Sequence, residues 1–107
     1  MFGQFFKSTP EISPRELEER LGGAEPPLVV DVREPGEYAQ GHIPGCTLMP
    51  LGVLGARLAE LPKDRELVVV CRSGGRSAMA TQHLTKAGYK ALNMAGGMMA
   101  WRGPVER

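Results

Sequence analysis

Residues 67–77 read Leu-Val-Val-Val-Cys-Arg-Ser-Gly-Gly-Arg-Ser. The run Leu67–Val70 has no polar alternation, which is typical of a parallel strand covered on both faces. The apolar residues of 77–87 recur on one stripe, as in an amphipathic helix, and Gly88 suits its C-terminal cap. Cys71 is therefore expected at a strand-to-helix turn.

A thiol at such a turn is a candidate nucleophile. The neighbouring Gly74 and Gly75 let the backbone adopt positive φ, so that successive N–H groups can point inward around the sulfur of Cys71. The positive end of the following helix faces the same place, and Arg72 and Arg76 add two cations. All these effects favour the thiolate over the thiol.

The size of the effect decides whether Cys71 is reactive. A free cysteine is only about 3% thiolate at pH 7, whereas one whose pKa falls to about 6.5 is about three-quarters ionised. The alternative is a buried cysteine that acts as a small hydrophobic side chain. A structural cysteine has no use for two glycines and two arginines, so we predict a reactive thiol.

Outward from this stretch, strands alternate with helices. Leu28–Val32 repeats the apolar pattern of the first strand, which favours an α/β domain built on a mainly parallel sheet. Ligands of such sheets bind beyond the carboxyl ends of the strands, where Cys71 falls. The other expected elements are a helix from Ser13 to Gly22, with a capping box from Ser13 to Glu16; helices near 35–40, 54–61 and 96–101; a turn at 41–45; and strands near 46–49 and 90–93.

Length and composition fit one domain. The 107 residues are 42% apolar and 23% charged, as in ordinary globular proteins. We expect an N-terminal arm over residues 1–10, with Phe5 or Phe6 packed against a domain that spans 11–107.

The charge is unevenly distributed along the chain. Residues 1–62 carry a net charge of −4 (five Lys or Arg against nine Asp or Glu) and residues 63–107 a net charge of +5 (eight against three). The basic half holds Cys71, which suits a small anionic substrate but lacks the basic stripe expected for nucleic acid.

No apolar run is long enough to cross a bilayer, and the first residues do not read as a secretion signal. Two cysteines are too few for a disulfide scaffold, and a catalytic thiol needs the reduced state. We therefore expect a reducing, cytoplasmic setting with no membrane partner. No close-spaced pair of ligands of the zinc type is present, so neither a metal nor another cofactor is expected.

Three ordered motifs resemble those of the single-domain rhodaneses, a family of sulfurtransferases. Residues 31–38 (Asp-Val-Arg-Glu-Pro-Gly-Glu-Tyr) with 41–45 (Gly-His-Ile-Pro-Gly) look like the first signature of that family. Residues 69–77 look like its active-site loop, and 93–101 (Asn-Met-Ala-Gly-Gly-Met-Met-Ala-Trp) like its C-terminal signature. The sequence departs from the family at Cys46, where alanine is common, and at Met98 and Met99.

The resemblance implies a rhodanese-like α/β fold, with a five-stranded, mainly parallel sheet flanked by helices on both faces. It also implies that Cys71 takes a sulfane sulfur from a donor such as thiosulfate, becomes a persulfide, and passes the sulfur to a thiophilic acceptor such as cyanide or a thiol. The substrate-binding cradle would be Arg72, Ser73, Gly74, Gly75, Arg76 and Ser77. The arginines are the candidates for receiving an anionic donor.

Several other residues are open to a functional and a structural interpretation. For Asp31 and Arg33 we favour an ion pair that supports the loop, and for His42 a hydrogen bond that holds its turn, over roles in substrate binding or catalysis. Cys46 can resolve an oxidised Cys71 or be a core thiol, and the core role is preferred. His83 is expected on a solvated helix face, and Trp101 in the core.

Three rival functions remain. A phosphatase or arsenate reductase spaces its cysteine and arginine as C-x5-R, whereas Cys71 and Arg76 are spaced as C-x4-R, which makes a ring one residue shorter that suits a single sulfur better than a phosphate. A non-catalytic interaction module would not need Cys71. A protein-to-protein persulfide relay uses the same chemistry, and the sequence does not separate it from turnover of small molecules.

Overall fold

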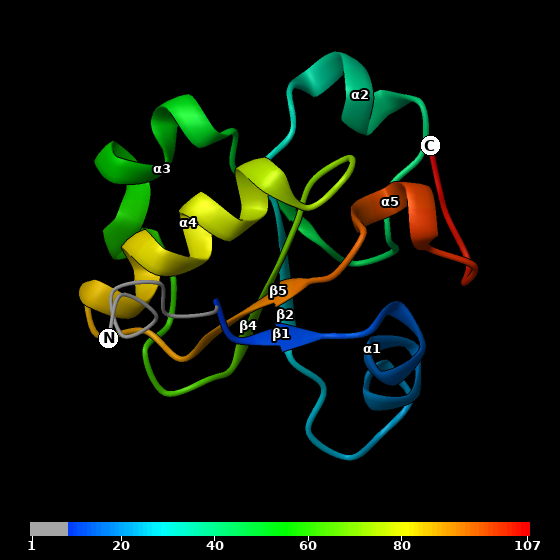
Figure 1. The fold of residues 1–107 in the computed structure, drawn as a ribbon, viewed down its shortest axis with the longest axis horizontal. Coiled ribbons are helices and arrows are strands. Elements are labelled where there is room, and N and C mark those ends of the chain that lie inside the picture. The colour runs from blue at the N-terminus through cyan, green and yellow to red at the C-terminus, as the bar shows by residue number, and fades with distance from the viewer. Residues whose placement is uncertain (1–8) are drawn as a thin grey trace, which may run out of the picture.

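The sheet of this protein has five strands, all parallel to their neighbours, in the order β1-β5-β4-β2-β3. The computed structural model describes residues 9–107. Cys71 directly follows the central strand, whose neighbours lie on both sides (Figure 1). The α/β fold with a parallel sheet is therefore confirmed. The strands are β1 (Glu11–Ile12), β2 (Leu28–Asp31), β3 (Thr47–Leu48), β4 (Leu67–Val70) and β5 (Ala91–Met94).

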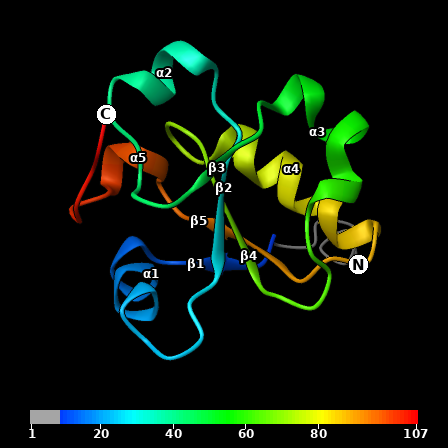
Figure 2. The same cartoon turned by 180° about the vertical axis from the view of Figure 1, so that it is seen from behind.

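Helices cover both faces of the sheet. Seen from either side, α3 and α4 lie together on one face, while α1 lies on the other (Figures 1 and 2). The helices are α1 (Pro14–Leu21), α2 (Pro35–Ala39), α3 (Leu51–Arg57), the 3-10 turn η2 (Leu58–Glu60), α4 (Gly75–Lys86) and α5 (Gly97–Ala100). None of the helices in residues 9–107 is both long and apolar enough to cross a membrane.

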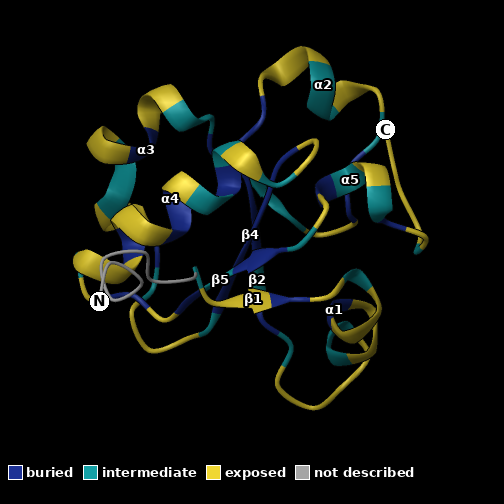
Figure 3. Ribbon diagram, in the orientation of Figure 1, coloured by how far each residue is buried: buried dark blue, intermediate teal, exposed yellow. Residues whose placement is uncertain are grey.

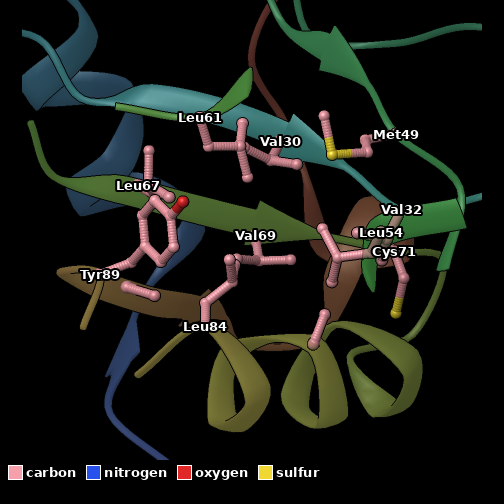
Figure 4. Close-up of a cluster of buried hydrophobic side chains, with 12 residues drawn as sticks. Val30, Val32, Met49, Leu54, Leu61, Leu67, Val69, Cys71, Leu84 and Tyr89 are labelled. Carbon is pink, nitrogen blue, oxygen red and sulfur yellow. The ribbon is translucent and has the colours of Figure 1, made fainter. Parts of the chain in front are cut away.

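Two hydrophobic cores result, because successive side chains of a strand point to opposite faces. Val30, Val69 and Cys71 belong to the core beneath α3 and α4, together with Leu54 and Leu84. Figure 4 shows this core, with Cys71 at one end of the cluster. The second core lies beneath α1 and contains Ile12, Leu17, Val29, Val68, Val70 and Trp101. Figure 3 shows the buried strands between these layers and the exposed loops around them.

Strand β1 was not predicted from the sequence pattern, because two residues are too few to show alternation. It is held by tertiary contacts: the Asn93 amide donates to the Pro10 carbonyl (2.8 Å), and the Ala95 amide donates to the Ile12 carbonyl (3.0 Å). Thr9 also accepts a hydrogen bond from Gln82 on α4. Thr9 and Pro10, assigned to the arm from the sequence, are thus in contact with the domain. The prediction for Phe5 and Phe6 lies outside the described residues.

Helix α1 begins as predicted, with the Ser13 hydroxyl accepting from the Glu16 amide at 3.0 Å. Only this half of the capping box forms, because the Glu16 carboxylate pairs instead with Arg20.

Two other helix boundaries were wrong. Helix α3 begins at Leu51 rather than near residue 54: Pro50 is its N-cap residue, without a side-chain cap, and the Leu51 amide donates to the Val32 carbonyl. Helix α4 begins at Gly75, two residues earlier than expected, because only Gly74 of the Gly74-Gly75 pair has positive φ, and Gly75 is helical.

Candidate active site

The loop after β4 curls around the sulfur of Cys71. Gly74 has φ 107°, a conformation that side-chain-bearing residues rarely adopt, and its amide donates to Cys71 Sγ at 3.0 Å. The Ser77 hydroxyl, in the first turn of α4, lies 3.2 Å from the same sulfur. Cys71 is only 1% exposed. The predicted concavity therefore forms, with one left-handed glycine rather than two.

Burial and hydrogen bonding act in opposite directions on the thiol. Burial raises the pKa of Cys71, but hydrogen bonds from the Ser77 hydroxyl and from the amides of Ser77, Gly74 and Ser73 outweigh it, so the pKa is lower than usual. The predicted direction is confirmed. The largest lowering effects come from amides and a hydroxyl rather than from the arginines.

A buried polar network supports this loop, and one of its members was missed in the sequence. Asn93, at 2% exposure on β5, accepts from the Ser77 hydroxyl at 2.5 Å and donates to the Gly74 carbonyl at 3.3 Å. Because the Ser77 hydroxyl has one proton and two acceptors, it donates to the sulfur of Cys71 only when it does not donate to Asn93. A polar residue inside the apolar strand 91–94 was the signal that could have identified Asn93.

The C-terminal motif holds the loop from the other side. The Met98 amide donates to the Cys71 carbonyl at 2.8 Å, and the Met99 amide donates to the Arg72 carbonyl at 3.0 Å. This contact requires glycine at position 97, where φ is +61° and a Cβ atom would lie 2.4 Å from the Arg72 carbonyl oxygen. The third motif therefore positions the second.

The two arginines of the loop differ in their surroundings. Arg76 pairs with Glu37 of α2 through two hydrogen bonds of 2.8 Å, and the bond from Arg76 is the main reason why the pKa of Glu37 falls to about 2. Arg72 is exposed and pairs with no acid among residues 9–107. It lines a cavity of about 470 Å³ together with Arg33, Glu37, Gln40, Met98 and Met99.

The favoured structural interpretations of Asp31, Arg33 and His42 agree with the contacts. Arg33 Nη2 lies 2.7 Å from Asp31 Oδ2 and also donates to the Gly41 carbonyl at 2.9 Å, so the buried pair fixes the segment around α2. The ring of His42 stacks on Tyr38 at 3.6 Å, and its Nδ1 donates to the Tyr38 carbonyl at 2.9 Å. These contacts hold the turn.

The remaining candidates also lie where the structural interpretations place them. Cys46 is partly buried and packs against the second core, and burial raises the pKa of its thiol to about 11. Trp101 is buried in the same core and donates from Nε1 to the Pro104 carbonyl. His83 is exposed on α4. Within the described residues, no three His, Cys, Asp or Glu side chains are placed to hold a metal ion.

Comparisons with known proteins find a matching family model, relatives in sequence and a similar solved structure. The family model described as Rhodanese-like domain matches residues 13–104. A sulfurtransferase of Allochromatium vinosum is 45% identical over 92 residues, which are 85% of this chain and 86% of that protein. YtwF of Bacillus subtilis is 41% identical over 96 residues, 90% of this chain and 93% of that protein. The crystal structure of a rhodanese-like domain protein from Staphylococcus aureus superposes with a TM-score of 0.86 at 35% identity, covering 91% of this chain and 96% of that one.

Proposed function

Because this chain belongs to the rhodanese-like domain family, we propose that it is a sulfurtransferase whose Cys71 thiolate carries the transferred sulfur as a persulfide. The observation that carries the proposal is the set of donors around Cys71 Sγ: the Gly74 amide at 3.0 Å and the Ser77 hydroxyl at 3.2 Å. Such preorganised donors stabilise an anion without rearranging during the reaction.

The reaction has two steps. In the first, the Cys71 thiolate attacks the outer sulfur of thiosulfate or of a persulfide; the new S–S bond forms as the old one breaks, and the electron pair leaves with sulfite or with the donor's thiolate. In the second, cyanide or a thiol attacks the outer sulfur of the Cys71 persulfide, and the electron pair returns to Sγ. Attack on sulfur is fastest when the attacking thiol has a pKa near the ambient pH, which the lowered pKa of Cys71 favours. No separate general base is needed.

The roles of the loop residues follow from this chemistry. The backbone of residues 72–77 is the cradle for the persulfide, and the Ser77 hydroxyl is a further donor to it. Arg72 is the candidate for receiving an anionic donor, because it is exposed beside the cavity. Arg76 is less suited, because Glu37 occupies its guanidinium. We propose a reducing compartment, the cytoplasm, which keeps Cys71 reduced.

The rivals have less support. In a phosphatase the loop arginine would make two hydrogen bonds to the substrate, but here Arg76 makes them to Glu37. The C-x4-R spacing of Cys71 and Arg76 is also one residue shorter than that of a phosphatase. An interaction module would have no need for the donors around Cys71. A persulfide relay shares the chemistry and differs only in its partner, so it remains part of the same proposal.

The test is direct loading of the thiol. Incubation of the reduced protein with thiosulfate or a small persulfide should add one sulfur atom to Cys71, detected by intact mass, and cyanide should remove it. The Cys71→Ser variant is the control and should add none. Sulfur addition to that variant, or hydrolysis of a phosphate ester by a wild-type protein that never accepts sulfur, would contradict the assignment.

A further inference from the structure

Three arginines lie at what we call the mouth of the candidate site: Arg33 and Arg72 line the cavity, and Arg76 pairs with Glu37, which also lines it. Acidic side chains already neutralise two of the three. Arg33 pairs with the buried Asp31, and Arg76 pairs with Glu37. Of these three arginines, only Arg72 pairs with no acid in the part of the chain that the structure describes. Counted together, these five side chains give the mouth a net charge of one positive unit.

The pairing of Glu37 is part of the fold. Besides the two hydrogen bonds from Arg76, Glu37 Oε1 accepts one from the Glu34 amide at 3.1 Å, in the first turn of α2. Pro35 begins that helix, and the Arg33 contact with Gly41 fixes the turn that follows it. Since the pKa of Glu37 is about 2, its carboxylate is ionised throughout the physiological range. Arg76 is therefore neutralised by a carboxylate held on two sides.

The walls of the cavity also suit an organic sulfur donor. Met98 and Met99 line it beside Arg72, and Met99 is 63% exposed. A thioether offers apolar, polarisable surface, which an organic persulfide can contact and which thiosulfate, being small and highly charged, cannot use.

We infer that Glu37 selects the sulfur donor by its charge: by neutralising Arg76 it favours the persulfide of an organic thiol over the thiosulfate dianion. The inference rests on the proposed function. When thiosulfate meets the Cys71 thiolate, three negative charges come together, and sulfite leaves with two of them. When a protonated persulfide reacts, one negative charge is present, and it leaves on the donor's thiolate while the proton stays on the new Cys71 persulfide.

The test measures the rate constant of Cys71 persulfide formation in a single turnover, by intact mass, for thiosulfate and for the persulfide of 2-mercaptoethanol. Glu37→Gln keeps an acceptor for the Glu34 amide and removes the charge. We expect about a tenfold faster reaction with thiosulfate, because the substitution removes one negative charge from the wall of the cavity. The reaction with the persulfide should change less than about twofold, since its reacting form is the neutral, protonated persulfide, and the thiosulfate gain should shrink as salt is added.

Two variants serve as controls. Glu60 makes a similar two-pronged pair with Arg57, with bonds of 3.0 and 2.9 Å, on η2. Glu60→Gln changes the net charge by the same amount and should alter neither rate. The double variant Glu37→Gln/Arg76→Gln has the same net charge at the mouth as the wild type, so the gain with thiosulfate seen in Glu37→Gln should be lost in it.

Three results would overturn the inference while leaving the proposed function intact: an unchanged ratio of the two rates in Glu37→Gln, an equal gain in Glu60→Gln, or a gain that persists in the double variant. If neither donor loads Cys71 in any variant, the proposed function itself fails, and the inference fails with it.

Discussion

At the scale of single residues, the chemistry of this protein depends on what donates to one sulfur. Cys71 is buried, which by itself raises the pKa of a thiol. Hydrogen bonds from Ser77, Gly74 and Ser73 reverse that effect. The sequence predicted inward-pointing amides, the helix end and two arginines as causes, without ranking them. Only the backbone angles of the folded loop show which amides donate to the sulfur.

The Ser77 hydroxyl gives a prediction at this scale. Ser77→Ala removes one hydrogen bond to the thiolate and should raise the pKa of Cys71 by about one to two units, since a bond to a charged group contributes about 1.5–3 kcal/mol. The pH dependence of alkylation by iodoacetamide measures this: the wild-type midpoint lies below that of an ordinary thiol, and the variant's midpoint moves up.

Thr81→Val is the matched control for that measurement. Thr81 is equally buried and donates to the Ser77 carbonyl at 2.7 Å, but it makes no hydrogen bond with the sulfur. Its midpoint should equal that of the wild type. A midpoint in Ser77→Ala at or below the wild-type value would show that the hydroxyl does not stabilise the thiolate.

At the scale of elements, the loop after β4 is held by the turn that begins α5. The Met98 and Met99 amides bind the carbonyls of Cys71 and Arg72, and Gly97 permits the approach. Two segments far apart in the sequence thus form one unit. The motif at 93–101 was recognised as a signature, but its structural role became clear only from these contacts.

Gly97→Ala should therefore disturb the site. Its Cβ atom would lie 2.4 Å from the Arg72 carbonyl oxygen at a φ of +61°, so the loop has to shift. We expect a loss of more than about 2 kcal/mol in the free energy of unfolding, from strain and lost contacts, with slower sulfur loading. Urea denaturation and single-turnover loading measure the two effects.

Gly55→Ala is the control for glycine replacement. Gly55 lies inside α3, and a Cβ atom there would meet nothing within 4 Å. It should gain up to about 1 kcal/mol from better helix propensity, with loading unchanged. If Gly97→Ala behaved like Gly55→Ala, the close contact between the two loops would not govern the site.

At the scale of the whole molecule, the sheet separates the two cysteines. Cys71 belongs to the core beneath α3 and α4, whereas Cys46 packs against the core beneath α1. Because burial raises the pKa of Cys46 to about 11, its thiol is a poor nucleophile in the folded protein.

Oxidation should therefore not join the two thiols. Treatment with diamide and glutathione should modify Cys71 and leave Cys46 free until the protein is unfolded, which peptide mapping with a thiol label can show. In Cys46→Ala, reductant should regenerate the free thiol of oxidised Cys71 as it does in the wild type. An intramolecular disulfide between residues 46 and 71 would instead support the resolving role for Cys46.

Much of the candidate site was predictable because its residues are contiguous. The strand 67–70, the reactive Cys71, the loop and the helix form one short segment, and local preferences are strong there. The ion pair of Asp31 with Arg33 was predictable for the same reason. Asn93 and the pairing of Glu37 with Arg76 were not, because each joins elements that are distant in the sequence.

The sequence alone determined the α/β class and the position of Cys71, because apolar runs, glycines and helix caps act over a few residues. Tertiary structure decided the rest. It added strand β1, whose pairing depends on β5. It also placed Glu37 against Arg76, so that of the three arginines at the candidate site only Arg72 pairs with no acid among residues 9–107. Charge near a site depends on distances between side chains, and only folding fixes those distances.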